Sequence, residues 1–204
     1  MKNSHDSELS RREFIGGTGA AIVAANATSL KAQERAGEAG GEQALEDVPR
    51  SRIALTVNGS EHRVEVEDRW TLTEFLRDHL GLTGTRMGCN RGECGSCTVL
   101  LDGEPIYSCS TLAVWADGRS VRTVDGLEVN GQVTNLQQAF MNHNAPQCGF
   151  CTSGQLMSAT ALLERNATPT AQEIRQALAG NLCRCSNYNA IVEAVQAAAE
   201  TGGA

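Results

Sequence analysis

The sequence contains no apolar run of about 18 residues, so it predicts no membrane span. It has no excess of positive charge either. The net charge is −7 and no Lys/Arg patch is visible, which argues against nucleic acid as a partner. There is also no P-loop, no G-x-G-x-x-G after a strand and no nucleophile–base constellation. The sequence therefore predicts no catalytic group and no FAD site of its own.

The composition is otherwise that of a globular protein, with 41% hydrophobic and 20% charged residues in a chain of 204. This length allows one large domain or two small ones. Residues 28–51 are the exception, because they are rich in Ala, Glu and Gly and contain no aromatic residue. We expect residues 33–51 to form a flexible tether ahead of the folded part.

An arginine pair, Arg11-Arg12, lies near the N-terminus and is followed by the small-residue stretch Gly16–Ala27. Paired arginines, a weakly hydrophobic stretch and a small-x-small exit are the layout of a twin-arginine signal. A chance arginine pair on a disordered tail would explain the pair alone. We assign residues 1–32 to the signal peptide and expect the protein in the periplasm, exported folded. Folded export suits a chain that must acquire a cofactor first.

Apolar residues alternate after the tether, first at Ile53, Leu55 and Val57, which is the periodicity of a strand. Strands around one helix, with a cysteine-rich loop, define an α+β unit that we place at residues 52–125. The expected elements are strands over 53–57, 64–66, 98–101 and 121–124, turns at 58–59 and 102–103, and a helix from Thr71 that Gly81 ends.

Helical spacing with Ala-rich faces follows Leu127. Thr170, with Glu173 three residues later, has the pattern of a capping box and marks one helix start. We therefore expect a second, helical unit at residues 126–200. Its helices cover 136–141, 154–165, 171–179 and 190–199.

The first four cysteines have the spacing C-x4-C-x2-C-x11-C, which is that of plant-type [2Fe–2S] ligands. Glycines in this loop permit positive φ and close backbone approach, so that N–H groups can point at sulfur. Thiolates are soft ligands that suit iron–sulfur clusters or zinc. The predicted cluster ligands are Cys89, Cys94, Cys97 and Cys109.

The second four cysteines have the spacing C-x2-C-x31-C-x1-C, and each pair precedes a predicted helix. A helix N-terminus presents its positive dipole end, which would stabilise an anionic cluster. We expect a second [2Fe–2S] cluster here. Its predicted ligands are Cys148, Cys151, Cys183 and Cys185.

Three other uses of the cysteines compete with this interpretation. An exported chain could be a disulfide scaffold, but a folded region of this size does not need disulfides. Structural zinc usually takes two C-x2–4-C knuckles, a pattern that neither group has. A Rieske cluster needs two histidine ligands beside cysteines, and His62, His79 and His143 form no such pair.

The cysteine motifs, in this order, resemble the small iron–sulfur subunit of the xanthine oxidase (molybdenum hydroxylase) family, most of all its periplasmic aldehyde dehydrogenase branch. The resemblance covers about residues 52–200. It is carried by GCNRGECGSCTVLLDG (Gly88–Gly103), Ser108-Cys109, QCGFCTSGQLMSA (Gln147–Ala159) and GNLCRCSNYNAIVEA (Gly180–Ala194).

The resemblance implies a plant-ferredoxin-like β-grasp domain followed by a four-helix-bundle [2Fe–2S] domain. It also implies a molybdenum–pterin site in a separate large subunit, from which electrons pass to the helical domain, then the ferredoxin-like domain, then a flavin or an external acceptor. By motif position, Gln147 would hydrogen-bond the pterin, and Cys185 would lie beside the pterin amino group while ligating iron. Any FAD would belong to another partner, such as an FAD-binding medium subunit.

One departure concerns Ser186-Asn187-Tyr188, where many relatives have Thr-Gly-Tyr. We expect Asn187 to preserve the turn, since Asn tolerates positive φ. Two functional alternatives remain: a free two-cluster ferredoxin, or a subunit of a related hydroxylase for purines, N-heterocycles or carbon monoxide. Apolar Phe150, Leu156 and Met157 near the second cysteine group favour docking to a partner over the free carrier.

The paired arginines yield a direct test of export. Replacing both, Arg11→Lys with Arg12→Lys, should leave the protein in the cytoplasm, because the pathway requires the arginine pair. Fractionation of periplasm and cytoplasm, followed by immunoblotting, measures this. Unchanged export of the double variant would remove the signal-peptide assignment.

Overall fold

The computed structural model describes residues 48–128 and 130–202. The predicted signal peptide (residues 1–32) and the tether as far as residue 47 lie outside the described residues. From Pro49 onward the chain forms one compact unit. Within the described residues, no helix is both long and apolar enough to cross a membrane.

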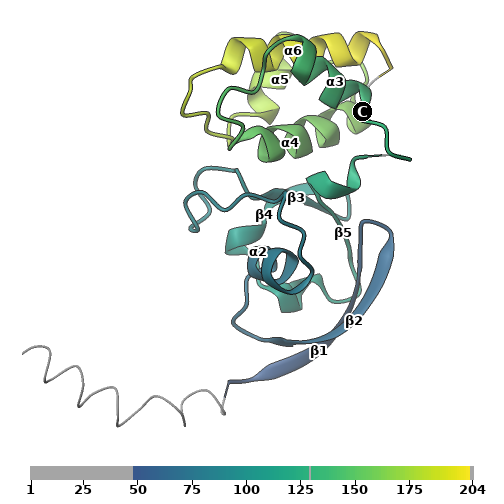
Figure 1. Cartoon of the computed structure of the whole chain (residues 1–204), viewed down its shortest axis with the longest axis vertical. Helices are drawn as coiled ribbons and strands as arrows, with labels where there is room; N and C mark the ends of the chain where they lie inside the picture. Colours follow the sequence, from purple (N-terminus) through teal and green to yellow (C-terminus); the bar gives the residue numbers. More distant parts are fainter. Residues whose placement is uncertain (1–47, 129, 203–204) are drawn as a thin grey trace, which may run out of the picture. The chain divides into compact units, whose positions relative to one another are not determined.

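A five-stranded mixed sheet occupies the first half of the described chain (Figure 1). Its strand order is β2-β1-β5-β3-β4. β1 runs parallel to β5 and antiparallel to β2, while β3 runs antiparallel to both β4 and β5. The strands are β1 (Arg50–Val57), β2 (Ser60–Glu67), β3 (Thr98–Leu101), β4 (Glu104–Tyr107) and β5 (Ser120–Arg122).

Two hairpin turns set the register of this sheet, and both were predicted. Asn58 and Gly59 have φ of 48° and 82°, and Asp102 and Gly103 have φ of 52° and 84°. Two successive left-handed residues are what a type I′ hairpin requires. Strand β4 was not predicted. It contains Pro105 and lies at the edge of the sheet, where a residue without an N–H is tolerated.

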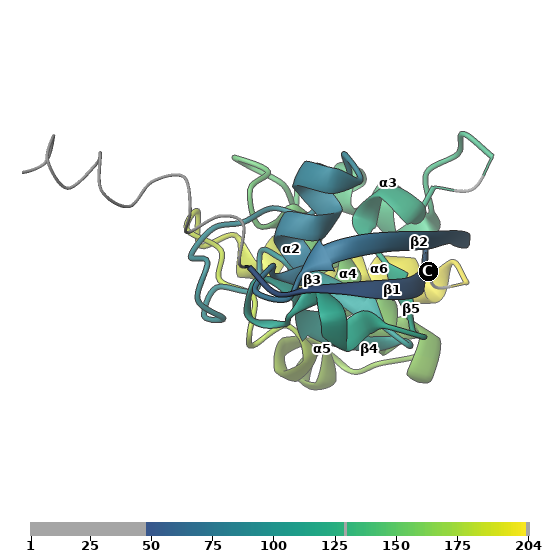
Figure 2. The same ribbon diagram turned by 90° about the horizontal axis from the view of Figure 1, so that it is seen from below.

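The predicted helix after Thr71 is present and packs against the sheet (Figure 2). Thr71 caps it through a capping box with Glu74. Only α2 (Leu72–Glu74) is an α-helix, and the following turn, Phe75–His79, is a π-helix. The apolar spacing could not distinguish these two forms. Gly81 follows with φ of 71°.

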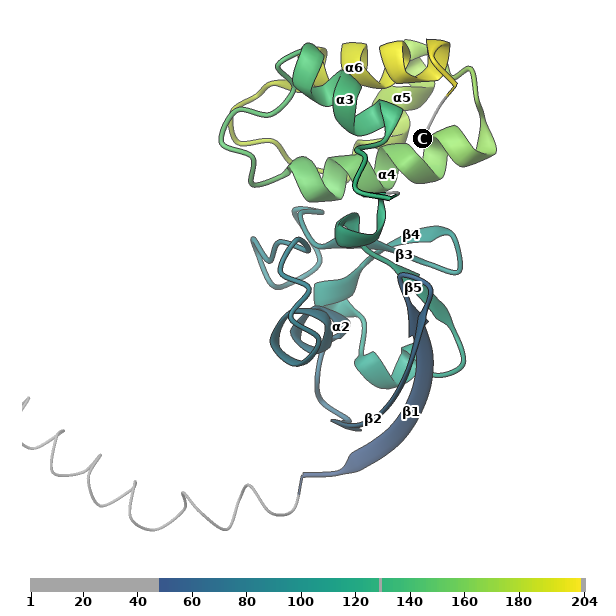
Figure 3. The same cartoon turned by 45° about the vertical axis from the view of Figure 1, so that its right-hand side comes forward.

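Four helices form the second half of the described chain, and all four were predicted within a few residues (Figure 3). The capping box of Thr170 and Glu173 is also confirmed. In the figure α4 is the helix next to β3 and β4, and it contacts both strands. The helices are α3 (Asn135–Asn142), α4 (Thr152–Arg165), α5 (Ala171–Ala177) and α6 (Tyr188–Glu200).

Two apolar cores hold these halves. One lies between the sheet and α2 and includes Leu55 and Phe75. The other lies between the four helices and includes Phe140 and Ile191, together with Leu100 from β3. A strand residue therefore belongs to the helical core, which joins the two halves through buried apolar contact. The exact boundary between residues 125 and 126 stays a prediction.

Candidate functional site

The sheet register brings two cysteines of the first group together. Cys97 directly precedes β3, and Cys109 lies in the 3₁₀ turn that follows β4. Because Thr98 pairs with Tyr107 across the hairpin, the residues just outside that pair become neighbours. Ser108 donates to the Cys97 carbonyl from its N–H at 3.4 Å and from Oγ at 2.6 Å. The Cys97 thiol lies within hydrogen-bonding reach of Cys109.

Backbone N–H groups of the preceding loop point at the sulfurs of this group. Glu93 and Cys94 donate to Cys89 Sγ at 3.3 and 3.4 Å, and Gly92 donates to Cys109 Sγ at 3.3 Å. Gly92 has φ of 73°, a conformation that glycine adopts without strain. The expected use of the glycine-rich loop is confirmed, because its donors stabilise negative charge on sulfur.

The thiols of the first group differ in their protonation. The Glu93 N–H lowers the pKa of Cys89 to about 6, against a smaller opposing effect of burial. Burial raises the pKa of Cys97 to about 11, and nearby Cys109 contributes to this rise. A thiolate is the form that ligates iron. The loop therefore favours the ligating form at Cys89, whereas Cys97 needs a cation to compensate its buried charge.

The second group also consists of two close pairs. The Cys148 thiol lies within hydrogen-bonding reach of Cys185, and the Cys151 thiol within reach of Cys183. Cys151 is the N-cap of α4, as expected from the sequence. The positive end of that helix does not dominate, because burial, and then Cys183, raises the pKa of Cys151 to about 12.

Asn187 ties the two loops of the second group to each other. Its Nδ2 donates to the carbonyls of Asn144 and Ala145 at 2.8 and 2.9 Å, just before the first cysteine pair. The next residue also contributes, since Tyr188 Oη accepts from the Cys183 N–H at 2.8 Å. These two side chains hold the loop of Cys183 against the segment that leads to Cys148.

The sequence-based expectation for Asn187 was wrong in one respect. Ser186, not Asn187, has the left-handed backbone, with φ of 58°. Asn187 has φ of −83° and is the N-cap of α6. The turn therefore survives with Asn187 acting through its side-chain amide rather than through its backbone.

The eight cysteines fit [2Fe–2S] clusters better than they fit the alternatives. All eight are free, so the disulfide scaffold is excluded. No group of three or more His, Cys, Asp or Glu within the described residues has the geometry to hold one metal ion. A [2Fe–2S] cluster instead needs four thiolates distributed over two irons. Two close thiol pairs in each group match that requirement. The eight ligand assignments stay predictions.

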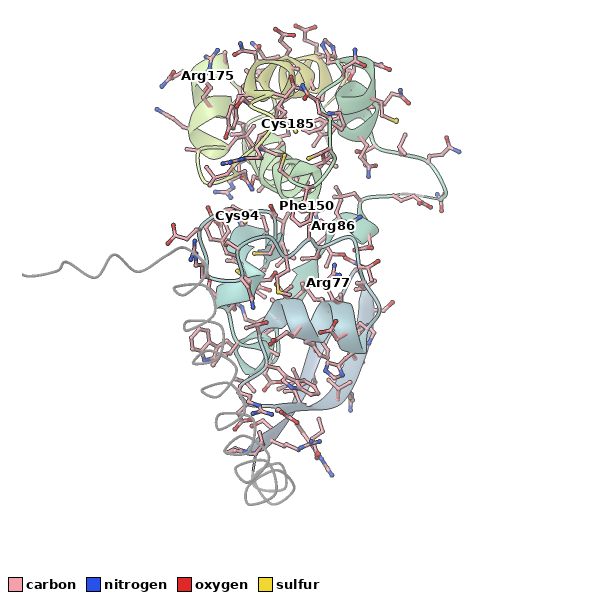
Figure 4. All side chains as sticks on the ribbon, turned by 60° about the vertical axis from the view of Figure 1, so that its left-hand side comes forward. Arg77, Arg86, Cys94, Phe150, Arg175 and Cys185 are labelled. Carbon is pink, nitrogen blue, oxygen red and sulfur yellow. The ribbon has the colours of Figure 1, made fainter. Side chains whose placement is uncertain are left out.

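One cavity of about 650 Å³ is lined by thiols of both groups, including Cys94 and Cys148. Exposed apolar side chains gather on its wall, namely Phe150, Leu182 and Tyr188, which are 47%, 55% and 42% exposed. Figure 4 shows Phe150 between Cys94 of the first group and Cys185 of the second. This exposed apolar surface lies immediately beside the thiols.

Two of the three apolar residues expected to favour docking do not reach the surface. Leu156 and Met157 are 6% and 0% exposed and belong to the helical core. They face inward because α4 is buried on almost every side. Only Phe150 meets the expectation. Gln147 and Cys148 are also exposed beside it.

Several polar residues near the thiols were missed by reasoning from the sequence. Asn181, Ser153 and Tyr107 make hydrogen bonds between the two halves of the chain. Their types and spacing carry no metal or catalytic pattern. The only signal was their place inside or beside the cysteine motifs.

Two domain families match the chain. Residues 55–121 match the family described as "2Fe-2S iron-sulfur cluster binding domain", and residues 123–196 match the "[2Fe-2S] binding domain" family. The prediction of iron–sulfur cofactors is thereby confirmed. The two families also confirm the α+β fold, a plant-ferredoxin-like domain followed by a helical [2Fe–2S] domain.

Known proteins of similar sequence and structure are subunits of larger enzymes. The nicotine 6-hydroxylase small subunit of Paenarthrobacter nicotinovorans is 53% identical over 146 residues, covering 72% of this chain and 88% of the relative. The aldehyde oxidoreductase iron–sulfur-binding subunit PaoA of Escherichia coli (strain K12) is 38% identical over 213 residues, covering 96% and 90%. The crystal structure of quinoline 2-oxidoreductase from Pseudomonas putida 86 matches with a TM-score of 0.70 at 46% identity, covering 76% of this chain and 99% of that chain.

These matches first define a class, that of electron-transfer proteins with two [2Fe–2S] domains. Within that class, the chain belongs to the iron–sulfur subunits of the xanthine oxidase (molybdenum hydroxylase) family. The resemblance first seen in the cysteine motifs is confirmed over the whole folded part.

The assignment of four cysteines to each cluster can be tested one group at a time. Cys97→Ser should remove one [2Fe–2S] EPR signal of the reduced protein and leave the other, and Cys183→Ser should do the reverse. Each variant is the control for the other, since both replace one buried thiol of a close pair. Iron analysis should show half of the wild-type content. Loss of the same signal in both variants would contradict the grouping.

Proposed function

We propose that this chain carries electrons away from a molybdenum–pterin site in a large partner subunit of an aldehyde oxidoreductase. The electrons enter at the helical domain, continue to the ferredoxin-like domain, and leave to a flavin in a further subunit or to an external acceptor. When bound, each [2Fe–2S] cluster takes up and releases one electron. The chain itself contributes the ligands, the insulation and the docking surface.

The exposed apolar surface around the second cysteine group is the observation that supports this proposal most. Phe150, Leu182 and Tyr188 expose large side chains on one cavity wall, where a soluble carrier would gain nothing from them. Contiguous exposed apolar residues mark interaction sites. A partner that covers them would exclude water from the neighbouring thiols.

Gln147 and Cys185 are the residues we propose for contact with the partner's pterin. Gln147 is exposed, so its amide is available to hydrogen-bond a group outside the chain. Cys185 is partly exposed, and its thiol pairs with exposed Cys148. This pair forms the accessible side of the second group, whereas Cys183 is buried. Electrons arriving from outside would therefore enter through the Cys148–Cys185 side.

The first group lies within one hydrogen bond of the second. The Leu182 N–H, adjacent to Cys183, donates to the carbonyl of Cys94 at 2.9 Å. This bond connects a ligand candidate of one group to a ligand candidate of the other by a short path. The order of the two groups in the relay follows from this contact and from the exposed entry side.

Aldehyde oxidation and periplasmic location rest on the same relative. The match to E. coli PaoA covers 96% of the chain, so it includes most of residues 1–47, where the paired arginines lie. We propose that these residues direct folded export to the periplasm. The nicotine 6-hydroxylase small subunit is more identical, at 53%, which favours N-heterocycle hydroxylation as a second candidate.

Purification of the native complex tests the function. We expect a stable complex that contains molybdenum, pterin and a large subunit, and that reduces an artificial acceptor when supplied with aldehydes. Activity with N-heterocycles but not with aldehydes would select the second candidate. A lone chain that is fully functional in electron transfer, with no molybdenum-containing partner, would contradict both.

Cys185→Ser tests the entry side within that complex. We expect the substrate-dependent turnover to fall by about a hundredfold or more, because loss of a ligand costs at least as much as loss of its outer partners. Glu164→Gln is the control, since Glu164 lies on the surface of α4 in an ion pair with Arg122. Equal turnover of the two variants would refute the role of Cys185.

A further inference from the structure

Three consecutive carbonyls of the first cysteine loop accept hydrogen bonds from the helical domain. The Cys94 carbonyl accepts from the Leu182 N–H at 2.9 Å, and the Gly95 carbonyl accepts from Asn181 Nδ2 at 2.9 Å. The Ser96 carbonyl accepts from Ser153 Oγ at 3.2 Å. Backbone of one domain is thus held, residue by residue, by donors of the other. We call this set of contacts the interloop junction.

Asn181 makes more contacts in this junction than any other side chain within it. It is 3% exposed, and its Nδ2 also reaches Thr98 Oγ1 at 3.2 Å. Its Oδ1 accepts from Ser158 Oγ of α4 at 2.8 Å, and its carbonyl accepts from Gln155 Nε2 at 2.9 Å. The residue is therefore fastened to α4 on one side and to the first cysteine loop on the other.

The orientation of the Asn181 amide is determined by its surroundings. The Gly95 carbonyl can only accept, so the amide atom that faces it must be the donor, Nδ2. This leaves Oδ1 toward Ser158, whose hydroxyl can donate. Replacing either partner would leave a buried polar group unsatisfied.

Glycines make the junction as close as backbone permits. A Cβ on Gly154 of α4 would collide with the Gly95 carbonyl, and a Cβ on Gly95 would collide with the Gly180 carbonyl. The two backbones are therefore in contact without intervening side chains. A slight shift of the loop would lengthen the bond between Leu182 and Cys94, because no side chain could follow to fill the space.

We propose that Asn181 is a positioning residue for electron transfer between the two cysteine groups. It holds the Cys94 carbonyl against the Leu182 N–H and thereby preserves the short path between the two clusters. One electron moves from the helical site, which is oxidised, to the ferredoxin-like site, which is reduced, and no bond is made or broken. This inference rests on the relay proposed above, but it can fail separately.

The test compares three variants of the full-length protein carrying both clusters. Asn181→Ala removes both donors and the Oδ1 acceptor. Ser158→Ala removes only the bond that orients the amide. Asn142→Ala is the matched control, because Asn142 is exposed on α3 and its side chain bonds only Gln138 within the described residues.

Pulse radiolysis measures the redistribution of one electron between the clusters, and EPR of the fully reduced protein measures their magnetic interaction. We expect Asn181→Ala to keep both signals and wild-type iron content while slowing the redistribution about 10- to 100-fold, the loss that a displacement of about 1 Å can cause. The magnetic interaction should weaken in parallel. Ser158→Ala should give a smaller change in the same direction, and Asn142→Ala none.

Unchanged redistribution and unchanged magnetic interaction in Asn181→Ala would overturn the proposal. If Asn181→Ala does not assemble its clusters, Ser158→Ala decides. A Ser158→Ala variant that loses its clusters too, or that transfers at the wild-type rate, shows that Asn181 serves assembly alone and overturns the proposal. Failure of the wild-type protein to pass an electron between clusters would instead refute the relay itself.

Discussion

Four thiols that lie together repel one another as soon as they ionise, and this repulsion is the constraint around which the protein is arranged. At Cys97 and Cys151 burial and a neighbouring thiol raise the pKa to about 11 and about 12, respectively. Such sites are satisfied only when a cation shares the charge. The loops respond by aiming N–H groups at sulfur, as Glu93 does at Cys89. Each half of the chain is therefore complete only with its iron.

The second consequence of the cysteine sites is the way in which the halves are joined. An electron path between two sites needs a contact that does not drift, and flexible side chains provide that poorly. The chain instead uses backbone against backbone, with glycine at positions 95 and 154 and a buried amide at Asn181. Leu100 of β3 adds apolar contact with the helical core. The two domains meet at their cysteine loops rather than at a linker.

Local features of the fold could be predicted because their causes are local. The Asn58-Gly59 and Asp102-Gly103 turns follow from the left-handed φ that these residues tolerate, and the Thr170 cap follows from a bond three residues away. Strand β4 was missed because Pro105 argues against a strand unless it lies at an edge, which only the assembled sheet reveals. Leu156 and Met157 were misjudged because helical spacing alone does not say which face of α4 is covered.

The sequence by itself determined the chemistry of this protein. Cysteine spacing specifies which thiols can gather around a small cluster, because short loops limit the reach of the backbone. Only the tertiary structure decided which cysteines pair, which side of the second group is exposed, and that Asn181 and Asn187 fasten the loops together. These facts depend on contacts between residues far apart in the chain, such as Asn181 and Gly95, and no local pattern records such contacts.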